Sequence, residues 1–278
     1  MIGILVPTID HSIFAQYVQS LEATLSAQDY GLIVAVTGGC LALEAQKSRD
    51  LLNLGVDGLI VSGVLRDPAF DKLVDRFEIP VLATSYFDQE APYPTIGYDN
   101  AAVAEMAVRY LKDCGHQRIA IVHGPVPEND RIAARIAGAE RACLETPLRL
   151  YPAELSVTGG ATAARAIFQD NSTDRAARCS AVLCMSDVQA LGVLFDAQRR
   201  ELRVPEDISI MGFDDLEWSR ESNPPLTTIR LPSKEMGEAA AMAMIAHLRE
   251  DAPFVPRELA AKIIERGSVS IGSWRDAK

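Results

Sequence analysis

Short apolar runs alternate along this chain with segments whose apolar residues recur every three or four positions. Residues 2–6 (IGILV) form the first run, and apolar side chains then repeat every four positions from Ile13 to Leu25. This spacing places them on one face of a helix, which we expect over 12–29 and which Gly31 ends. The chain therefore opens with a strand and an amphipathic helix.

The same alternation continues almost to the end of the chain. Apolar runs predict strands at 2–6, 32–36, 57–61, 79–83, 94–98, 118–122, 148–151, 180–184, 207–213 and 226–231. Helical spacing predicts helices at 12–29, 41–54, 68–77, 100–113, 130–145, 161–170, 187–200 and 233–249. Strands that are apolar throughout and separated by helices are typical of parallel sheets covered on both faces.

The strands fall into two similar halves, and a single open sheet of about ten strands is unusual. We therefore predict an α/β protein with two doubly wound parallel-sheet lobes. Ligands of such sheets bind beyond the carboxyl ends of the strands, so the cleft between two lobes is the expected site.

Composition and charge limit the partners of the chain. Among its 278 residues, 27 basic and 38 acidic side chains give 27 − 38 = −11, which argues against nucleic-acid binding by this chain itself. The chain shows no apolar run of about 18 residues, the length that a membrane span needs. Its start has no features of a secretory signal. We expect a cytoplasmic protein that does not bind membranes.

Enzyme signatures are not found in the sequence. It contains no G-x-G-x-x-G after a strand, no G-x-x-x-x-G-K-[ST], no G-x-S-x-G and no H-E-x-x-H. The histidines are isolated from one another, at positions His11, His116, His123 and His247. The five cysteines match no common zinc spacing, so we expect reduced, mostly buried thiols. These observations predict no catalytic site, no cofactor and no metal.

Polar and aromatic side chains follow several of the predicted strands. The first candidates are Asp10, Ile13, Phe14, Ser85, Tyr86, Asp88, Arg131, Arg135, Ser186, Asp187 and Asp214. Carboxylates and arginines offer directional hydrogen bonds, and aromatic rings offer flat apolar faces of the kind that stack on sugar rings. The alternative is structural: Asp187 caps the helix 187–200, and Phe14 and Tyr86 belong to the core or to the interface between the lobes. Adjacent Asp214 and Asp215 point in different directions at a strand end, so one binds ligand and the other is structural.

Nearly the whole chain resembles the effector-binding domain of lactose-repressor-type (LacI/GalR) transcription regulators. The matching stretches are IGILVPTIDHSIFAQYVQSLE (2–22), GVDGLIVSG (55–63), IPVLATSY (79–86), CGHQRIAIVHGP (114–125), RIAARIAGAERA (131–142), VPEDISIMGFDD (204–215) and PPLTTIRLP (224–232). The pairing of the last two stretches at this spacing is the most specific feature.

The resemblance implies a type I periplasmic-binding-protein-like fold, with two lobes joined by three crossovers near Asp99, Leu231 and Phe254. The N-terminal lobe would comprise 1–99 plus 232–254, and the C-terminal lobe 100–231 plus 255–278. A small effector, usually a sugar, a sugar phosphate or a nucleobase, would bind in the cleft between them.

Carried over residue by residue, the resemblance supplies the expected effector contacts. Arg135, three residues before Gly138, matches the effector-binding arginine of the family, and Asp214 matches its cleft carboxylate. The full set is Asp10, Ile13, Phe14, Ser85, Tyr86, Arg131, Arg135, Ser186, Asp187, Phe213 and Asp214. Ser85 and Ser186 stand where the family usually has Asp and Asn. Either the effector differs from a simple hexose, or Asp10 and Asp88 supply the missing groups.

The resemblance also implies a helix-turn-helix headpiece ahead of this domain. Met1 here directly precedes the first strand, so we expect operator DNA to be bound only through a headpiece that this chain lacks. We expect a homodimer, with the apolar faces of 41–54 and 68–77 either forming its interface or packing on their own sheet. The alternative is a solute-binding protein of a sugar transport system with the same fold.

Overall fold

The computed structural model describes residues 1–10, 12–143, 148–173 and 178–271. His11, the end of the predicted helix 130–145 and the last residues of the expected C-terminal lobe lie outside the described residues. The chain divides into two compact units. The first unit comprises 1–99, 127–131 and 232–260, and the second comprises 100–126, 132–231 and 261–278.

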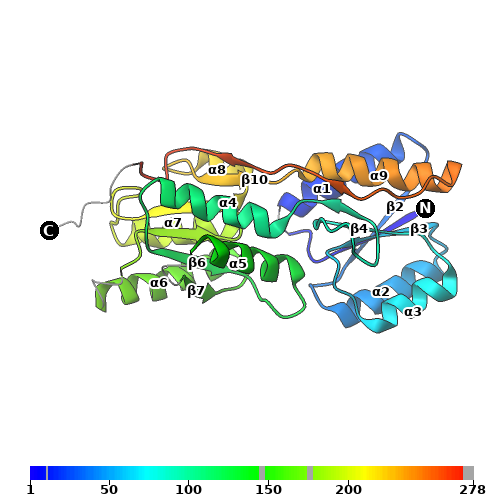
Figure 1. Cartoon of the computed structure of the whole chain (residues 1–278), viewed down its shortest axis with the longest axis horizontal. Coiled ribbons are helices and arrows are strands. Elements are labelled where there is room, and N and C mark those ends of the chain that lie inside the picture. The colour runs from blue at the N-terminus through cyan, green and yellow to red at the C-terminus, as the bar shows by residue number, and fades with distance from the viewer. Residues whose placement is uncertain (11, 144–147, 174–177, 272–278) are drawn as a thin grey trace. The chain divides into compact units, whose positions relative to one another are not determined.

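The first unit is built on a six-stranded parallel sheet (Figure 1). Its strands are β1 (Ile2–Val6), β2 (Leu32–Val36), β3 (Gly58–Ser62), β4 (Val81–Thr84), β5 (Thr95–Gly97) and β11 (Arg257–Glu258). They lie in the order β11-β5-β4-β3-β1-β2, and every pairing is parallel. All carboxyl ends therefore lie at one edge of this sheet.

Two pairs of helices cover the two faces of the first sheet. Helices α1 (Ser12–Ser26) and α9 (Ser233–Glu250) pack side by side and share an apolar cluster with β1. Helices α2 (Leu41–Asn53) and α3 (Pro68–Phe77) share another cluster with β3 and β4. The apolar faces of α2 and α3 thus pack on their own sheet, which decides between the two alternatives that the sequence left open for them.

The second unit repeats the arrangement with one strand reversed. Its strands are β6 (Ile119–His123), β7 (Arg149–Pro152), β8 (Ala181–Cys184), β9 (Ser209–Asp214), β10 (Thr227–Arg230) and β12 (Lys262–Ile264). They form a six-stranded sheet in the order β12-β10-β9-β8-β6-β7, with β12 antiparallel to β10. Its helices are α4 (Asn100–Asp113), α5 (Asp130–Ala142), α6 (Val157–Thr173), α7 (Asp187–Arg199) and α8 (Glu217–Glu221). The predicted α/β class with two doubly wound sheets is confirmed.

The sequence missed three short elements and two features of the division into units. β11, β12 and α8 are short and lack the apolar periodicity that predicts an element. Because β11 pairs with β5, the last segment of the first unit extends to Ala260 rather than to Phe254. Residues 127–131 also belong to the first unit, although they lie far from the expected crossovers.

Helices α6 and α7 make a glycine-mediated contact in the second unit. A Cβ atom on Gly160 would lie 2.0 Å from the carbonyl oxygen of Gln189, and one on Gly192 would lie 2.1 Å from that of Val157. Because these glycines serve close approach rather than helix termination, α6 begins at Val157, earlier than the predicted residue 161.

We expect Gly192→Ala to destabilise the second unit by about 1–3 kcal/mol, because the added methyl group has no room against the α6 backbone. This cost exceeds the gain of about 1 kcal/mol in helix propensity. Urea unfolding measures the difference. Gly124→Ala is the control, since a Cβ there meets nothing within 4 Å. Equal stability of the two variants would contradict the close packing of α6 on α7.

Candidate functional site

Arg135 lies at the centre of a cluster in the second unit. Its side chain projects from α5 and is buried; Nε donates to Asn100 Oδ1 at 3.0 Å and Nη1 donates to the Met185 carbonyl oxygen at 2.9 Å. The guanidinium carbon lies 4.6 Å from the centroid of the Phe213 ring, within cation–π range. The guanidinium is therefore held by an amide, a backbone carbonyl and an aromatic face.

The close contact between α5 and α4 at Gly138 positions the Arg135 side chain. One helical turn after it, a Cβ on Gly138 would lie 2.0 Å from the carbonyl oxygen of Ala101, so α5 rests directly on the first turn of α4. Asn100 begins that turn. The close approach explains how the Arg135 side chain reaches the Asn100 amide.

Asp214 ends β9 within this cluster. It has a positive φ of 120° and is buried, and its carboxylate accepts hydrogen bonds from the Ser186 hydroxyl and the Asp187 backbone N–H. Burial raises the pKa of Asp214 well above its ordinary value, and the nearby charge of Asp187 raises it further. The positive charge of Arg135 and the two hydrogen bonds oppose this rise.

Ser186 caps α7, and Asp187, the first residue of the helix, binds the segment that follows β9. The Ser186 hydroxyl accepts the Val188 N–H at 3.3 Å and caps the helix, the role that the structural alternative gave to Asp187. The Asp187 carboxylate instead accepts from Leu216 N at 2.8 Å and from the hydroxyls of Ser219 and Thr228 at 2.6 Å each. Asp187 therefore ties the turn after β9 to α7 and β10.

Asp187 reaches its partners because β9 carries a glycine beside it. A Cβ on Gly212 would lie 2.1 Å from Asp187 Oδ1. Burial raises the pKa of Asp187 from its ordinary value, while its hydrogen bonds lower it.

Asp215 has different partners from Asp214, as the sequence predicted. It forms ion pairs with Arg230 at 2.6 Å and with Arg266, and these two arginines lower its pKa. Asp215 is thus the structural member of the acidic pair.

The predicted residues of the first unit are less closely grouped. Ser85 follows β4 with a φ of 63°, is buried, and donates its N–H to Met236 Sδ at 3.2 Å. Asp10 is exposed in the bend after β1. Ile13 and Phe14 lie in the first turn of α1, and the Phe14 side chain packs against the apolar cluster under that helix.

Tyr86 and Arg131 both lie close to Asp130 in the first unit. Burial raises the pKa of Tyr86, and Asp130, Asp88 and Asp99 raise it further. Arg131 forms an ion pair with Asp130 at 3.3 Å, and its Nη1 would lie 2.0 Å from a Cβ on Gly63. The structure thus groups five predicted residues of the second unit: Arg135, Ser186, Asp187, Phe213 and Asp214. In the first unit it groups only Tyr86 and Arg131, which both lie close to Asp130.

Sequence reasoning missed the Arg135 partners Asn100 and Met185. Asn100 is only the first residue of the predicted helix 100–113, and the Met185 contact uses a backbone carbonyl, which every residue carries. Among the residues that the structure describes, no group of three His, Cys, Asp or Glu side chains could hold a metal ion. All five cysteines are free, and four are buried, as expected.

Comparisons with known proteins identify the family. The periplasmic-binding-protein-like domain family matches residues 108–269. The transcriptional regulator MalR of Streptomyces coelicolor is 30% identical over 290 residues, covering 97% of this chain and 80% of the relative. This chain belongs to the LacI family of transcriptional regulators.

Two further matches agree with this assignment. The ribose operon repressor of Haemophilus influenzae is 29% identical over 89% of this chain and 74% of its own length. The fold matches a LacI family regulator from Enterococcus faecium, solved with bound ribose, with a TM-score of 0.82, 24% identity and coverage of 97% and 98% of the two chains. In the described part of this LacI-family chain, no helix is long and apolar enough to span a membrane.

The raised pKa of Asp214 predicts a pH dependence of stability. The folded state binds this proton up to a higher pH than the unfolded state, whose Asp pKa is about 3.9. Stability therefore falls as the pH rises from the unfolded value through the folded value. In Asp214→Asn, which cannot ionise, we expect urea unfolding from about pH 5 to about pH 9 to show a shallower fall.

Asp207→Asn is the matched control, because Arg203 lowers the pKa of Asp207 and this group stays ionised in both states over that range. Asp187, whose pKa is also raised, leaves some pH dependence in the Asp214→Asn variant. Identical slopes for wild type and Asp214→Asn would show that Asp214 ionises as readily folded as unfolded.

Proposed function

We propose that this chain is the effector-binding and dimerisation domain of a LacI-family regulator. It binds a small polar molecule, a sugar or sugar derivative, through groups that follow the carboxyl ends of its strands. Effector binding controls DNA binding by the regulator. The observation that carries the proposal is the immobilised guanidinium of Arg135 beside the buried carboxyl of Asp214.

These two groups suit a ligand rich in hydroxyls. A guanidinium presents several donors in a fixed plane, and holding it in place before binding lowers the entropy cost of binding. A carboxyl whose pKa is raised toward the working pH can donate or accept a hydrogen bond, and a hydroxyl can do both in return. The Phe213 ring lies against the Arg135 guanidinium and helps to fix its position.

The first unit supplies the second set of proposed contacts. These are Asp10, Ile13, Phe14, Ser85, Tyr86 and Arg131. The second unit adds Ser186 and Asp187 to the proposed contacts. An effector that contacts groups from both units favours the arrangement in which both sets reach it. It thereby shifts the population toward that state, which is the allosteric step of the proposal.

A sugar is the effector class that the relatives favour. One relative is named as a ribose operon repressor, and one structural neighbour holds ribose. The short side chains of Ser85 and Ser186 give this chain fewer strong hydrogen-bonding groups than a simple hexose site in the family. The named relatives are regulators, which supports a cytoplasmic regulator over a transport-type binding protein or an enzyme.

Isothermal titration calorimetry tests the site, with D-ribose first and then a panel of sugars, sugar phosphates and nucleobases. For the ligand that binds, we expect Arg135→Ala and Asp214→Ala each to weaken binding by about 1–3 kcal/mol through lost charge-assisted hydrogen bonds. Arg109→Ala, at an exposed arginine of α4, should bind as wild type does.

Two results would overturn the proposal. Binding no tighter than millimolar across the whole panel would remove the sensor function. Wild-type affinity in both the Arg135 and the Asp214 variant would remove the site assignment and leave the function open.

Light scattering tests the proposed homodimer. We expect a mass twice that of the 30.2 kDa chain. A transport-type binding protein of the same fold predicts a monomer, so a single-chain mass at high protein concentration would count against the regulator.

A further inference from the structure

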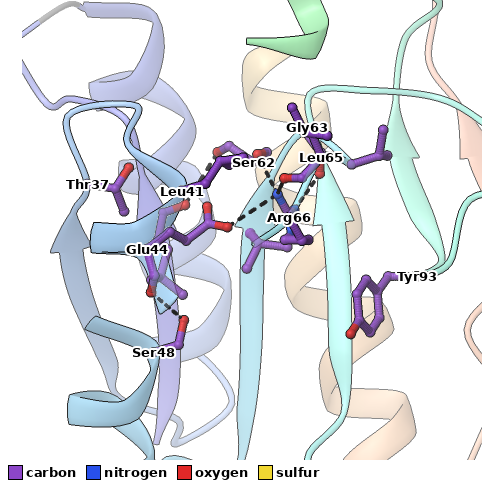
Figure 2. A network of polar contacts seen from close by, with 12 residues as sticks. Thr37, Leu41, Glu44, Ser48, Ser62, Gly63, Leu65, Arg66 and Tyr93 are labelled. Atoms are coloured by element: carbon purple, nitrogen blue, oxygen red, sulfur yellow. Dashed lines mark hydrogen bonds and ion pairs between the residues drawn. The ribbon is translucent and has the colours of Figure 1, made fainter. Parts of the chain in front are cut away.

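The turn between β3 and α3, residues 62–66, is folded around the side chain of its own last residue. Arg66 Nη1 donates to the carbonyl oxygen of Leu65 at 2.6 Å and to that of Ser62 at 3.4 Å, and Nη2 donates to that of Gly63 at 2.5 Å. Figure 2 shows the guanidinium beneath these residues. One guanidinium thus gathers three carbonyl groups of a five-residue segment.

Arg66 is buried together with one counter-ion from another element. Glu44 of α2 points toward it, and Glu44 Oε1 lies 3.4 Å from Arg66 Nη1, with 7% and 4% of the two side chains exposed (Figure 2). Neither Glu44 Oε1 nor Arg66 Nε has a hydrogen-bond partner. A buried ion pair with unsatisfied atoms is a poor source of stability. The pair is therefore better explained by what it holds in place.

The N–H groups of the same turn point to a carboxylate. Asp130 Oδ2 accepts from Val64 N at 2.5 Å and from Leu65 N at 2.8 Å, while Asp130 Oδ1 accepts from Arg131 N at 2.8 Å. The peptide groups of the turn thus have a cation on their carbonyl side and an anion on their N–H side. Each charge polarises the peptide groups toward the other, so the two sets of hydrogen bonds strengthen one another.

The turn also provides the surface on which Arg131 rests. Gly63 has a φ of 77°, and a Cβ on it would lie 2.0 Å from Arg131 Nη1. The guanidinium of Arg131 therefore lies directly against the Gly63 backbone and beside Asp130, 3.3 Å away. Any shift of the turn moves both supports of Arg131.

We propose that Arg66 is a positioning residue for Arg131: by clamping the carbonyl groups of the 62–66 turn, it fixes the N–H groups that hold Asp130 and the glycine surface against which Arg131 lies. Glu44 neutralises Arg66 inside the first unit. Arg66 itself contacts no effector. This inference rests on the proposed function only where it names Arg131 as an effector contact.

Amide hydrogen exchange followed by NMR tests the clamp without any ligand. We expect Arg66→Met to speed exchange at Val64 and Leu65 by about tenfold or more, the factor that corresponds to one lost net hydrogen bond. Arg66→Lys, which keeps the charge but lacks the planar fork, should give a smaller acceleration. Arg109→Met is the control at an exposed arginine and should leave both amides unchanged.

A second variant covers the case in which Arg66→Met fails to fold because Glu44 is left unpaired. The double variant Glu44→Gln with Arg66→Met removes both charges together, and we expect the same faster exchange at Val64 and Leu65. Wild-type exchange at these amides in the folded double variant would overturn the clamp.

Titration with D-ribose, and with the panel ligand that binds if ribose does not, separates this inference from the proposed function. We expect Arg131→Gln and Arg66→Met each to weaken binding by about tenfold, with no further loss when they are combined, because both act through one guanidinium. If Arg131→Gln binds as wild type does, Arg131 is not a contact and that part of the proposed function fails. If Arg131→Gln weakens binding and Arg66→Met does not, the positioning role fails. If no ligand binds, the sensor function fails, and hydrogen exchange alone decides the clamp.

Discussion

Parallel strand pairing is the constraint on which the rest of this structure depends. Every pairing in the first sheet is parallel, and in the second only β12 runs against its neighbour. Parallel strands need a crossover between each pair, so helices cover both faces and all carboxyl ends lie at one edge. Ser85 follows β4 in the first sheet, and Ser186 and Asp214 lie at the ends of β8 and β9 in the second, for this reason. Residues far apart in the sequence therefore meet at the edge of one sheet.

The polar groups at these edges are satisfied by the protein before any ligand arrives. Asp187 accepts three hydrogen bonds from its own unit, Asp130 accepts three N–H groups, and Arg66 donates to three carbonyls. These hydrogen bonds hold neighbouring segments together whether or not a ligand is bound. Asp214 also accepts two hydrogen bonds from its own unit, and burial together with the nearby charge of Asp187 raises its pKa, so a ligand can change its protonation.

Glycines lie where two elements, or a backbone segment and a buried side chain, approach each other closely. Gly138 sets α5 on α4 under Arg135, Gly212 admits the Asp187 carboxylate beside β9, and Gly63 carries Arg131. In the sequence these residues are indistinguishable from helix ends or turn residues. The prediction that α6 starts at residue 161 was wrong for the same reason, since Gly160 packs against α7 and Gly159 packs against the backbone of Glu154, and neither breaks the helix.

The sequence by itself determined the α/β class, the order of the long elements and the strand ends at which chemistry could gather, because periodicity and apolar runs are local properties. The family resemblance assigned effector-binding roles to Arg135 and Asp214 and added Phe213 to the candidates. Only the tertiary structure decided that Arg135 meets Asn100 and Met185, which lie 35 and 50 residues away along the chain. It alone paired Glu44 with Arg66 and assigned 127–131 to the first unit. Such contacts depend on which surfaces pack together, and no local pattern in the sequence records that choice.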